Sequence, residues 1–269
     1  MSSDPHISDI MAFADRLATA SAGVTLPLFR TALTADNKAE DGDFDPVTDA
    51  DREAESVMRT LIRQTYPDHG IEGEEHGGER LDADYVWVLD PIDGTRAFIS
   101  GLPLWGTLIG LKYRGAPVFG LMHQPFTDET FSGAAFPAAA PLTLYRRGTA
   151  SGTLRTRECA DLSSATISTT SPRMFTGTNL EAYNRVEGQC RLARYGYDCY
   201  AYAMVAAGHV DLVVEAGLKP CDIVALVPVI EAAGGVVTSW TGGPVTAGGT
   251  AVAAGDPRVH EVALALLNG

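Results

Sequence analysis

The sequence predicts an α+β fold built from two halves, and three observations lead to this interpretation. Residues 1–150 place two helical patterns before a run of strand patterns, whereas residues 151–269 alternate strand and helix patterns. Helices followed by a run of strands favour an antiparallel sheet, and alternation favours strands joined by helices. The 269 residues, of which 45% are hydrophobic, suffice for a large core. We therefore expect an N-terminal domain with an antiparallel sheet and a C-terminal domain with a smaller mixed sheet.

Two amphipathic helices are expected near the N-terminus. Ser8 is suited to cap the first and Thr48 to cap the second, which Tyr66-Pro67 ends. The acidic segment 35–45 between them predicts a loop. Apolar residues recur at helical spacing on one face of each helix, namely Ile10, Ala14, Leu17 and Ala18 in the first and Ala54, Val57, Met58, Leu61 and Ile62 in the second.

A strand that ends in two carboxylates follows. Tyr85–Leu89 is apolar, β-branched and aromatic, and it leads directly into the acids Asp90 and Asp93. Pro91 keeps the chain before it extended, so both acids and the intervening carbonyl are expected at one strand end, where a hard divalent cation finds oxygen ligands. Gly94-Thr95 then begins a helix, and free N–H groups there suit phosphate. The pentapeptide 90–94 taken alone is more typical of an exposed turn, and only the other acidic stretches of the chain favour a metal site.

Further strand patterns occur in both halves. In residues 1–150 they cover 71–75, 102–113, 117–124, 129–131 and 142–145. In residues 151–269, strands at 166–169, 192–195, 210–215, 236–240 and 251–254 alternate with helices at 179–190, 199–207, 222–233 and 259–267.

Three more acids are candidates to join the carboxylates at the strand end. Asp51 lies in the first turn of a helix, Glu74 ends a short strand, and Asp222 opens a helix. Each also has an ordinary structural explanation, because helix N-termini favour acids and surface loops are often acidic. On the residues alone, both interpretations stay open.

Four stretches, in sequence order, resemble the inositol monophosphatase family. They are Asp45-Pro46-Val47-Thr48-Asp49-Ala50-Asp51, Gly73-Glu74-Glu75, Asp90-Pro91-Ile92-Asp93-Gly94-Thr95, and Asp222 followed by Ala233-Gly234-Gly235. Together they span nearly the whole chain. The resemblance implies a five-layer α-β-α-β-α sandwich, a homodimer, and Mg²⁺-dependent, lithium-sensitive hydrolysis of small phosphate monoesters.

The resemblance also assigns roles in the site. It implies that up to three Mg²⁺ ions are held by Glu74, Asp90, the Ile92 carbonyl, Asp93 and Asp222. It further implies catalytic roles in activating and orienting the attacking water for Asp51, Glu74 and Thr95, and a phosphate cradle formed by the amides of Gly94 and Thr95. An oxygen-only ligand set suits Mg²⁺. Cys221 stands where the family usually has an aromatic residue, commonly Trp, and we expect it to be inert filler.

The substrate is expected to be L-histidinol phosphate, because 101–111 and 197–200 resemble the histidinol-phosphate phosphatase branch of the family. Asp198 and Glu215 would bind the cationic alcohol near the leaving group, although Asp198 is equally suited to cap the helix at 199–207. Two alternatives remain. One is an inositol-1-monophosphatase or a related sugar or nucleotide phosphatase, and the other is a metal-binding scaffold without catalysis.

Composition excludes several classes of function. A formal net charge of −14 argues against nucleic acid as a partner. No apolar run approaches the ~20 residues needed to span a membrane. The four cysteines form no C-x-x-C pair, and there is no signal-peptide pattern, so we expect a cytoplasmic protein with reduced thiols and no zinc site.

Overall fold

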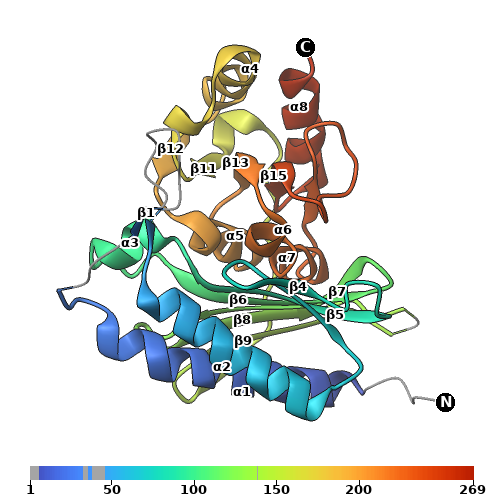
Figure 1. The fold of residues 1–269 in the computed structure, drawn as a ribbon. Helices are drawn as coiled ribbons and strands as arrows, with labels where there is room; N and C mark the ends of the chain where they lie inside the picture. Colours follow the sequence, from blue (N-terminus) through green and yellow to red (C-terminus); the bar gives the residue numbers. More distant parts are fainter. Residues whose placement is uncertain (1–5, 33–35, 38–45, 138) are drawn as a thin grey trace.

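The computed structural model describes residues 6–32, 36–37, 46–137 and 139–269, and these form five layers (Figure 1). Helices α1 (Ile7–Leu28) and α2 (Asp49–Thr65) cover the outer face of an eight-stranded sheet. The middle layer contains α5 (Asp198–Ala206), α6 (Pro220–Ile223) and α7 (Leu226–Ala232). A five-stranded sheet and then α4 (Gly177–Glu187) and α8 (Pro257–Leu267) complete the stack. The expected five-layer α-β-α-β-α sandwich is confirmed.

The eight-stranded sheet is antiparallel apart from one pair. Its order is β10-β9-β8-β7-β6-β5-β3-β4, and among its described strands only β3 and β5 run parallel. Its strands are β3 (Gly70–Gly73), β4 (Gly77–Glu79), β5 (Tyr85–Asp93), β6 (Gly106–Tyr113), β7 (Ala116–Gln124), β8 (Glu129–Ala134), β9 (Leu142–Arg147) and β10 (Ala150–Gly152). A separate pair joins β1 (Asp36–Asn37) to β2 (Pro46–Val47).

The five-stranded sheet is mixed, as expected. Its order is β12-β11-β13-β15-β14, with the first three strands parallel and β15 antiparallel to both of its neighbours. Its strands are β11 (Thr166–Thr169), β12 (Leu192–Tyr195), β13 (Leu212–Leu218), β14 (Val236–Thr238) and β15 (Gly249–Ala254).

Three glycines in register allow the middle layer to approach the large sheet closely. Gly110, Gly120 and Gly133 lie opposite one another on β6, β7 and β8. A Cβ atom at Gly120 would lie 1.7 Å from the Ala225 carbonyl oxygen, and one at Gly133 would lie 2.2 Å from that of Pro228. Only glycine leaves room for this backbone contact. The stripe therefore fixes how closely the segment that follows α6 sits against the sheet.

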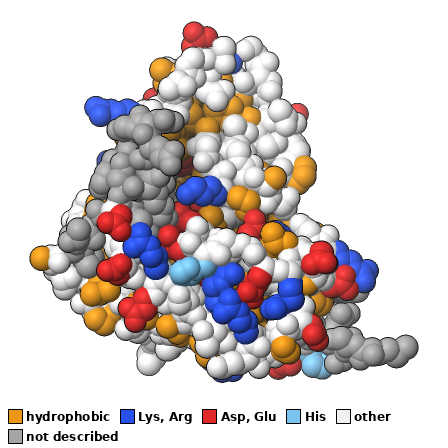
Figure 2. All heavy atoms as spheres, viewed as in Figure 1, with side chains coloured by type: hydrophobic (Ala, Val, Ile, Leu, Met, Phe, Trp, Pro, Cys, Tyr) orange, Lys and Arg blue, Asp and Glu red, His pale blue; other side chains and the backbone are white. Residues whose placement is uncertain are grey.

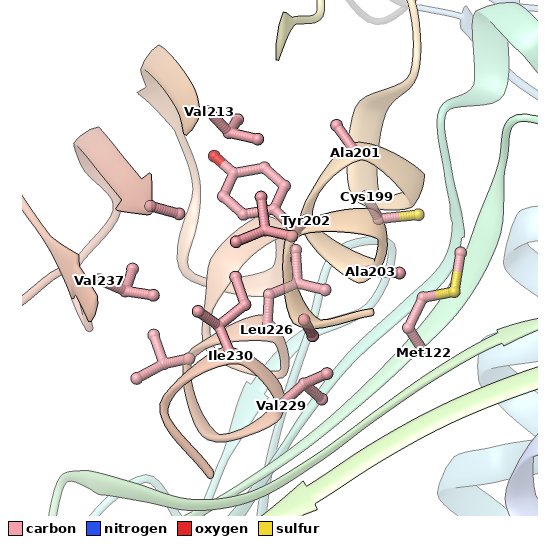
Figure 3. Close-up of a cluster of buried hydrophobic side chains, with 14 of the residues drawn as sticks. Met122, Cys199, Ala201, Tyr202, Ala203, Val213, Leu226, Val229, Ile230 and Val237 are labelled. Carbon is pink, nitrogen blue, oxygen red and sulfur yellow. The ribbon is translucent and has the colours of Figure 1, made fainter. Parts of the chain in front are cut away.

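The middle layer buries side chains from both halves of the chain. In Figure 3, Met122 of the large sheet faces Cys199 of α5, while Val213 and Val237 approach from the smaller sheet. Leu226 and Ile230 of α7 fill the space between them. The change of sheet falls between β10 and β11. Because one core joins the two sheets, the division into domains at residue 150 stays a prediction.

The differences from the expected elements have local causes. The helix expected at 222–233 is divided into α6 and α7, because Pro228 has no N–H to donate to the carbonyl of Val224. Strands β4 and β10 were not expected, and both are short and largely exposed, so neither shows an alternating pattern. Most of the loop expected at 35–45 lies outside the described residues. Within the described part of the chain, no helix is both long and apolar enough to cross a membrane.

Candidate metal and phosphate site

A cavity of about 300 Å³ lies where β5, α3 (Thr95–Ile99), α5, β13 and α6 meet. Eight of the site residues expected from the sequence line it, namely Glu74, Asp90, Ile92, Asp93, Gly94, Thr95, Asp198 and Asp222. Asp51 and Glu215 are buried behind its wall, each no more than 2% exposed. Figure 2 shows acidic and basic side chains next to one another where the two halves of the molecule meet.

Asp90 and Asp93 occupy the end of β5. The strand continues through both acids, beyond the end expected at Leu89, and its pairing with β6 shifts register between them. Asp90 Oδ1 accepts the N–H of Ile92 at 3.0 Å, which fixes the local bend. The shift allows two acids three residues apart to approach the same cavity.

Asp222 brings a third carboxylate from the other half of the chain. It is the third residue of α6 and not its N-cap, which is Lys219. Its Oδ2 accepts the backbone N–H of Lys219 at 2.7 Å, so it still takes part in capping its own helix. One oxygen each from Asp90, Asp93 and Asp222 lie within 4.8 Å of one another. The capping interpretation of Asp222 and its place in an acidic cluster are therefore compatible.

The carboxylates raise one another's pKa. Burial is the main cause of the raised pKa of Asp90, and the charges of Glu74, Asp93 and Asp222 add to it. Burial, followed by the charges of Asp198 and Asp222, likewise raises the pKa of Asp93. Buried like charges require a cation or protons for compensation. The donor set of carboxylates and one carbonyl fits a hard cation such as Mg²⁺.

Glu74 follows β3 and is held in place by buried groups. Its N–H donates to the carbonyl of Leu89 at 3.2 Å. The next two N–H groups, of Glu75 and His76, donate to the carboxylate of Glu55 on α2 at 2.7 and 3.2 Å. Arg59 pairs with Glu55 at 2.9 Å, so that buried acid is compensated. Glu55 therefore positions the loop that carries Glu74, and no sequence motif had marked it as a functional residue.

Cys221 also reaches this cluster, which differs from the filler role expected for it. It packs with Val88 and Val224, but its Sγ lies within 4.8 Å of carboxylate oxygens of both Glu74 and Asp90. The thiol donates to Asp222 Oδ1 at 3.4 Å. Burial and the charges of Asp90 and Asp222 raise the pKa of this thiol.

The helix start expected at Gly94-Thr95 is confirmed. Gly94 has a φ of 84°, a left-handed conformation that favours glycine, and its carbonyl accepts the first helical bonds from Ala97 and Phe98. The N–H groups of Gly94 and Thr95 precede those bonds, where a helix leaves donors for a ligand. The Thr95 hydroxyl donates to the Ile92 carbonyl at 3.1 Å.

Asp51 acts in the cap of α2 and also contributes to the field of the cavity. Its Oδ2 accepts the N–H and the hydroxyl of Thr48 at 2.8 and 2.6 Å. Its charge also raises the pKa of Asp90. The helix-cap explanation considered for Asp51 is thus correct, and it places the carboxylate next to the acidic cluster.

The two expected substrate residues lie in different surroundings. Asp198 lines the cavity with a φ of 44°, and it is the first residue of α5 and not its N-cap, which is Tyr197. The N–H of Cys199 donates to Asp93 Oδ2 at 2.6 Å. Glu215 is 1% exposed, and its Oε1 accepts the N–H of Thr170 at 2.6 Å. Burial raises the pKa of Glu215 to about 8. Thr170 lines the cavity and its side chain hydrogen-bonds Asp198. Glu215 therefore holds Thr170 in place and does not itself line the cavity.

Lys219 and Arg96 are cavity residues that the sequence did not predict. Lys219 Nζ lies 3.1 Å from Glu74 Oε1, and its side chain is about half exposed. Arg96 lies in α3, and its charge lowers the pKa of Asp198 against the larger effect of burial. Lys219 stands three residues before Asp222, and Arg96 stands three residues after Asp93. This closeness in sequence to the expected metal ligands could have indicated both cations.

Comparisons with known proteins are consistent along the whole chain. The model of the inositol monophosphatase family matches residues 6–268. The bifunctional phosphatase IMPL2 of Arabidopsis thaliana, a chloroplastic protein, is 44% identical over 97% of this chain and 76% of its own length. The histidinol-phosphatase of Mycobacterium tuberculosis is 34% identical, covering 84% of this chain and 86% of that protein. A structure of an inositol monophosphatase from Zymomonas mobilis has a TM-score of 0.86 at 40% identity, covering 98% of this chain and 100% of that one.

Proposed function

The chain belongs to the inositol monophosphatase family, whose members are metal-dependent phosphomonoesterases, and on this premise we propose that it hydrolyses L-histidinol phosphate with Mg²⁺ as cofactor. The products would be L-histidinol and inorganic phosphate, as in histidine biosynthesis. We further propose that the protein is located in the cytoplasm and forms a homodimer.

The observation that carries the choice of substrate is the position of Asp198. Its carboxylate lines the cavity beside Gly94, where an added Cβ would lie 3.1 Å from Asp198 Oδ2. Asp198 is the first residue of α5, whose N-cap is Tyr197, so it does not serve as the helix cap. A carboxylate next to the phosphate cradle suits an alcohol that carries an ammonium and an imidazole group.

The acidic residues of the cavity would bind the metal ions. Glu74, Asp90, the Ile92 carbonyl, Asp93 and Asp222 would hold up to three Mg²⁺ ions. When bound, Mg²⁺ supplies charge neutralisation for the phosphate and an activated water as nucleophile. The pKa values of Asp90, Asp93 and Asp222, which are raised first by burial and then by neighbouring carboxylates, support this role, because a bound cation would compensate the buried negative charge.

The residues of β5 and α3 would bind and orient the ester. The N–H groups of Gly94 and Thr95 would donate to phosphate oxygens. The Thr95 hydroxyl, directed at the Ile92 carbonyl, would orient the attacking water together with Asp51 and Glu74. Positioning of this kind is a large part of catalysis of phosphoryl transfer.

A second candidate substrate is an inositol monophosphate. The solved structure at 40% identity is of an inositol monophosphatase, and its identity to this chain exceeds the 34% of the histidinol-phosphatase. An inositol ring carries hydroxyl groups and no ammonium, so Asp198 would then accept hydrogen bonds from hydroxyls and the advantage of its charge would be smaller.

One set of assays tests the proposal. Inorganic phosphate release is measured from histidinol phosphate, inositol 1-phosphate and a nucleotide bisphosphate, with Mg²⁺ and with chelator. We expect kcat/KM to be highest for histidinol phosphate and activity to need the cation. Faster hydrolysis of inositol 1-phosphate would support the second candidate, and no hydrolysis of any ester, with Mg²⁺ binding intact, would support the inactive scaffold.

A further inference from the structure

We propose that Cys221 adds a sulfur ligand beside the cavity, so that Glu74, Asp90 and Cys221 together bind a thiophilic divalent cation such as Zn²⁺ or Co²⁺. The cation would compete with Mg²⁺ for the two carboxylates. This inference rests on the metal positions of the proposed function and is independent of the substrate.

The distances between the three side chains fit a shared cation. Their ligand atoms lie within 4.8 Å of one another. An oxygen about 2.0 Å and a sulfur about 2.3 Å from one ion can be at most about 4.3 Å apart. Closing the difference takes at most about half an ångström, which a rotation of the Glu74 side chain can supply.

The sulfur is directed at the acids and is shielded from bulk water. Cys221 is 6% exposed, and its thiol donates to Oδ1 of Asp222, a residue that lines the cavity. It also packs against the buried side chains of Val88 and Val224. A residue that only filled space between two valines would have no need of a polar partner among carboxylates.

A cationic group already lies at this end of the cavity. The ammonium of Lys219 is 3.1 Å from Glu74 Oε1, although that side chain is 51% exposed and can swing into solvent. The location is therefore one at which the folded chain stabilises positive charge. A divalent ion would displace the ammonium, because the two charges repel at this distance.

Cation preference follows from the chemistry of sulfur. Binding breaks the S–H bond of Cys221, the thiolate binds the cation, and the proton passes to solvent. A thiolate selects Zn²⁺ or Co²⁺ over Mg²⁺, which prefers oxygen. Three protein ligands leave a fourth position open for water or a phosphate oxygen, as at catalytic zinc sites. We therefore expect Zn²⁺ to bind tightly and to inhibit Mg²⁺-dependent turnover.

Cobalt substitution gives the decisive test. Metal-free protein is titrated with Co²⁺, and we expect a near-ultraviolet sulfur-to-cobalt charge-transfer band that saturates at one ion. The band should disappear in Cys221→Ser and persist in Cys190→Ser, which removes a half-buried thiol at the end of α4. Affinity for Zn²⁺, measured by calorimetry, should fall at least ~10- to 100-fold in Cys221→Ser, the scale seen for outer-shell partners, while Mg²⁺ affinity changes little.

The outcomes separate this inference from the proposed function. No charge-transfer band in the wild-type protein, or an equal band in Cys221→Ser, would overturn it and leave Cys221 as a packing residue. If Cys221→Ser does not fold, alkylation of Cys221 by iodoacetamide is measured in the wild-type protein. Slower alkylation in the presence of Zn²⁺ would support the site, and an unchanged rate would overturn it. A band without hydrolysis of any phosphate ester would retain the site and reject the proposed function.

Discussion

The carboxylate of Asp93 accepts the backbone N–H of Cys199 at 2.6 Å, which joins positions 106 residues apart. Asp93 ends β5 in the large sheet, and Cys199 lies in the first turn of α5 in the middle layer. An anionic acceptor at a helix N-terminus is stabilising, since it satisfies a free N–H and faces the positive end of the helix dipole. One acid of the cavity therefore also sets where α5 begins, and with it the position of Asp198.

The first prediction concerns the acids of β5. Asp90→Asn and Asp93→Asn should each reduce Mg²⁺-dependent phosphate release by on the order of 10- to 100-fold or more, because even partners outside the ligand set have effects of that size. The metal-free Asp90→Asn protein should melt no lower than wild type, since the substitution removes a buried charge whose pKa its neighbours raise.

Phosphate release and thermal melting in chelator check both statements. Asp84→Asn is the control, because it removes an exposed acid that pairs with Arg114 far from the cavity. Wild-type turnover in either β5 variant, or full activity of the wild-type protein in chelator, would contradict the metal role of these acids.

The second prediction concerns the Thr95 hydroxyl, which donates to the Ile92 carbonyl at 3.1 Å. If it orients the attacking water, Thr95→Ala should lower kcat on the order of 100-fold with a much smaller change in KM. Thr95→Ser keeps the hydroxyl and should restore most of the rate. A change confined to KM, measured by steady-state kinetics, would limit Thr95 to binding phosphate.

The third prediction concerns the ion pair between Lys219 and Glu74. Lys219→Met should tighten Mg²⁺ binding, because the ammonium no longer competes for the Glu74 carboxylate. The pair is half exposed, so the gain is about 1 kcal/mol at most, or roughly fivefold in Kd. Calorimetric titration measures it, with Arg114→Met as a matched loss of positive charge elsewhere. Equal effects of the two variants would show a general change of net charge.

The fourth prediction concerns pH and His69, which stacks between Tyr66 and Tyr85 with ring centroids 4.6 and 5.0 Å away. Its Nδ1 accepts the indole N–H of Trp87 at 3.1 Å, so the neutral ring fits this position. Burial lowers the pKa of His69 from 6.5 to about 4, against the opposing charge of Asp68.

The sign of this pH effect follows from the lowered pKa. The free energy of unfolding that the neutral His69 ring contributes is fully present above pH ~6.5 and is lost as pH falls toward ~4. In this range the unfolded chain binds a proton on His69 and the folded chain does not. The ring remains partly in water, which reduces the loss to about 1–2 kcal/mol. Urea denaturation at several pH values should show it in wild type and in the exposed-site control His209→Gln, but not in His69→Gln. A parallel loss in His69→Gln would assign the effect to other groups.

The sequence was sufficient for features that depend on local pattern. The two amphipathic helices, the apolar strand before Asp90 and the helix start at Gly94 each arise from residues next to one another. Such local patterns do not predict contacts between residues that are distant in the sequence. The sequence could not show that Asp93 rather than Asp198 binds the Cys199 N–H, or that the Cys221 sulfur reaches Glu74 and Asp90. Both contacts join residues that lie more than 100 positions apart in the sequence.

The last prediction concerns recognition of the substrate by Asp198. A charge-assisted hydrogen bond between this carboxylate and an ammonium contributes roughly 1.5–3 kcal/mol. Asp198→Ala should therefore reduce kcat/KM for histidinol phosphate by ~10- to 100-fold, since about 1.4 kcal/mol corresponds to a factor of ten. Inositol 1-phosphate and p-nitrophenyl phosphate carry no ammonium, so their kcat/KM should fall much less.

A variant of nearly unchanged shape separates charge from packing at this position. Asp198→Asn retains the size of the side chain and removes its charge, so it should lose most of the same selectivity. Thr170 and Arg96 lie near Asp198 in both variants, and circular dichroism should report the same fold. Equal losses of kcat/KM for all three esters would mean that Asp198 does not contact the substrate. Its role would then be structural, at the start of α5, where its backbone has a φ of 44°. Loss for histidinol phosphate alone would assign the specificity of the cavity to this one carboxylate.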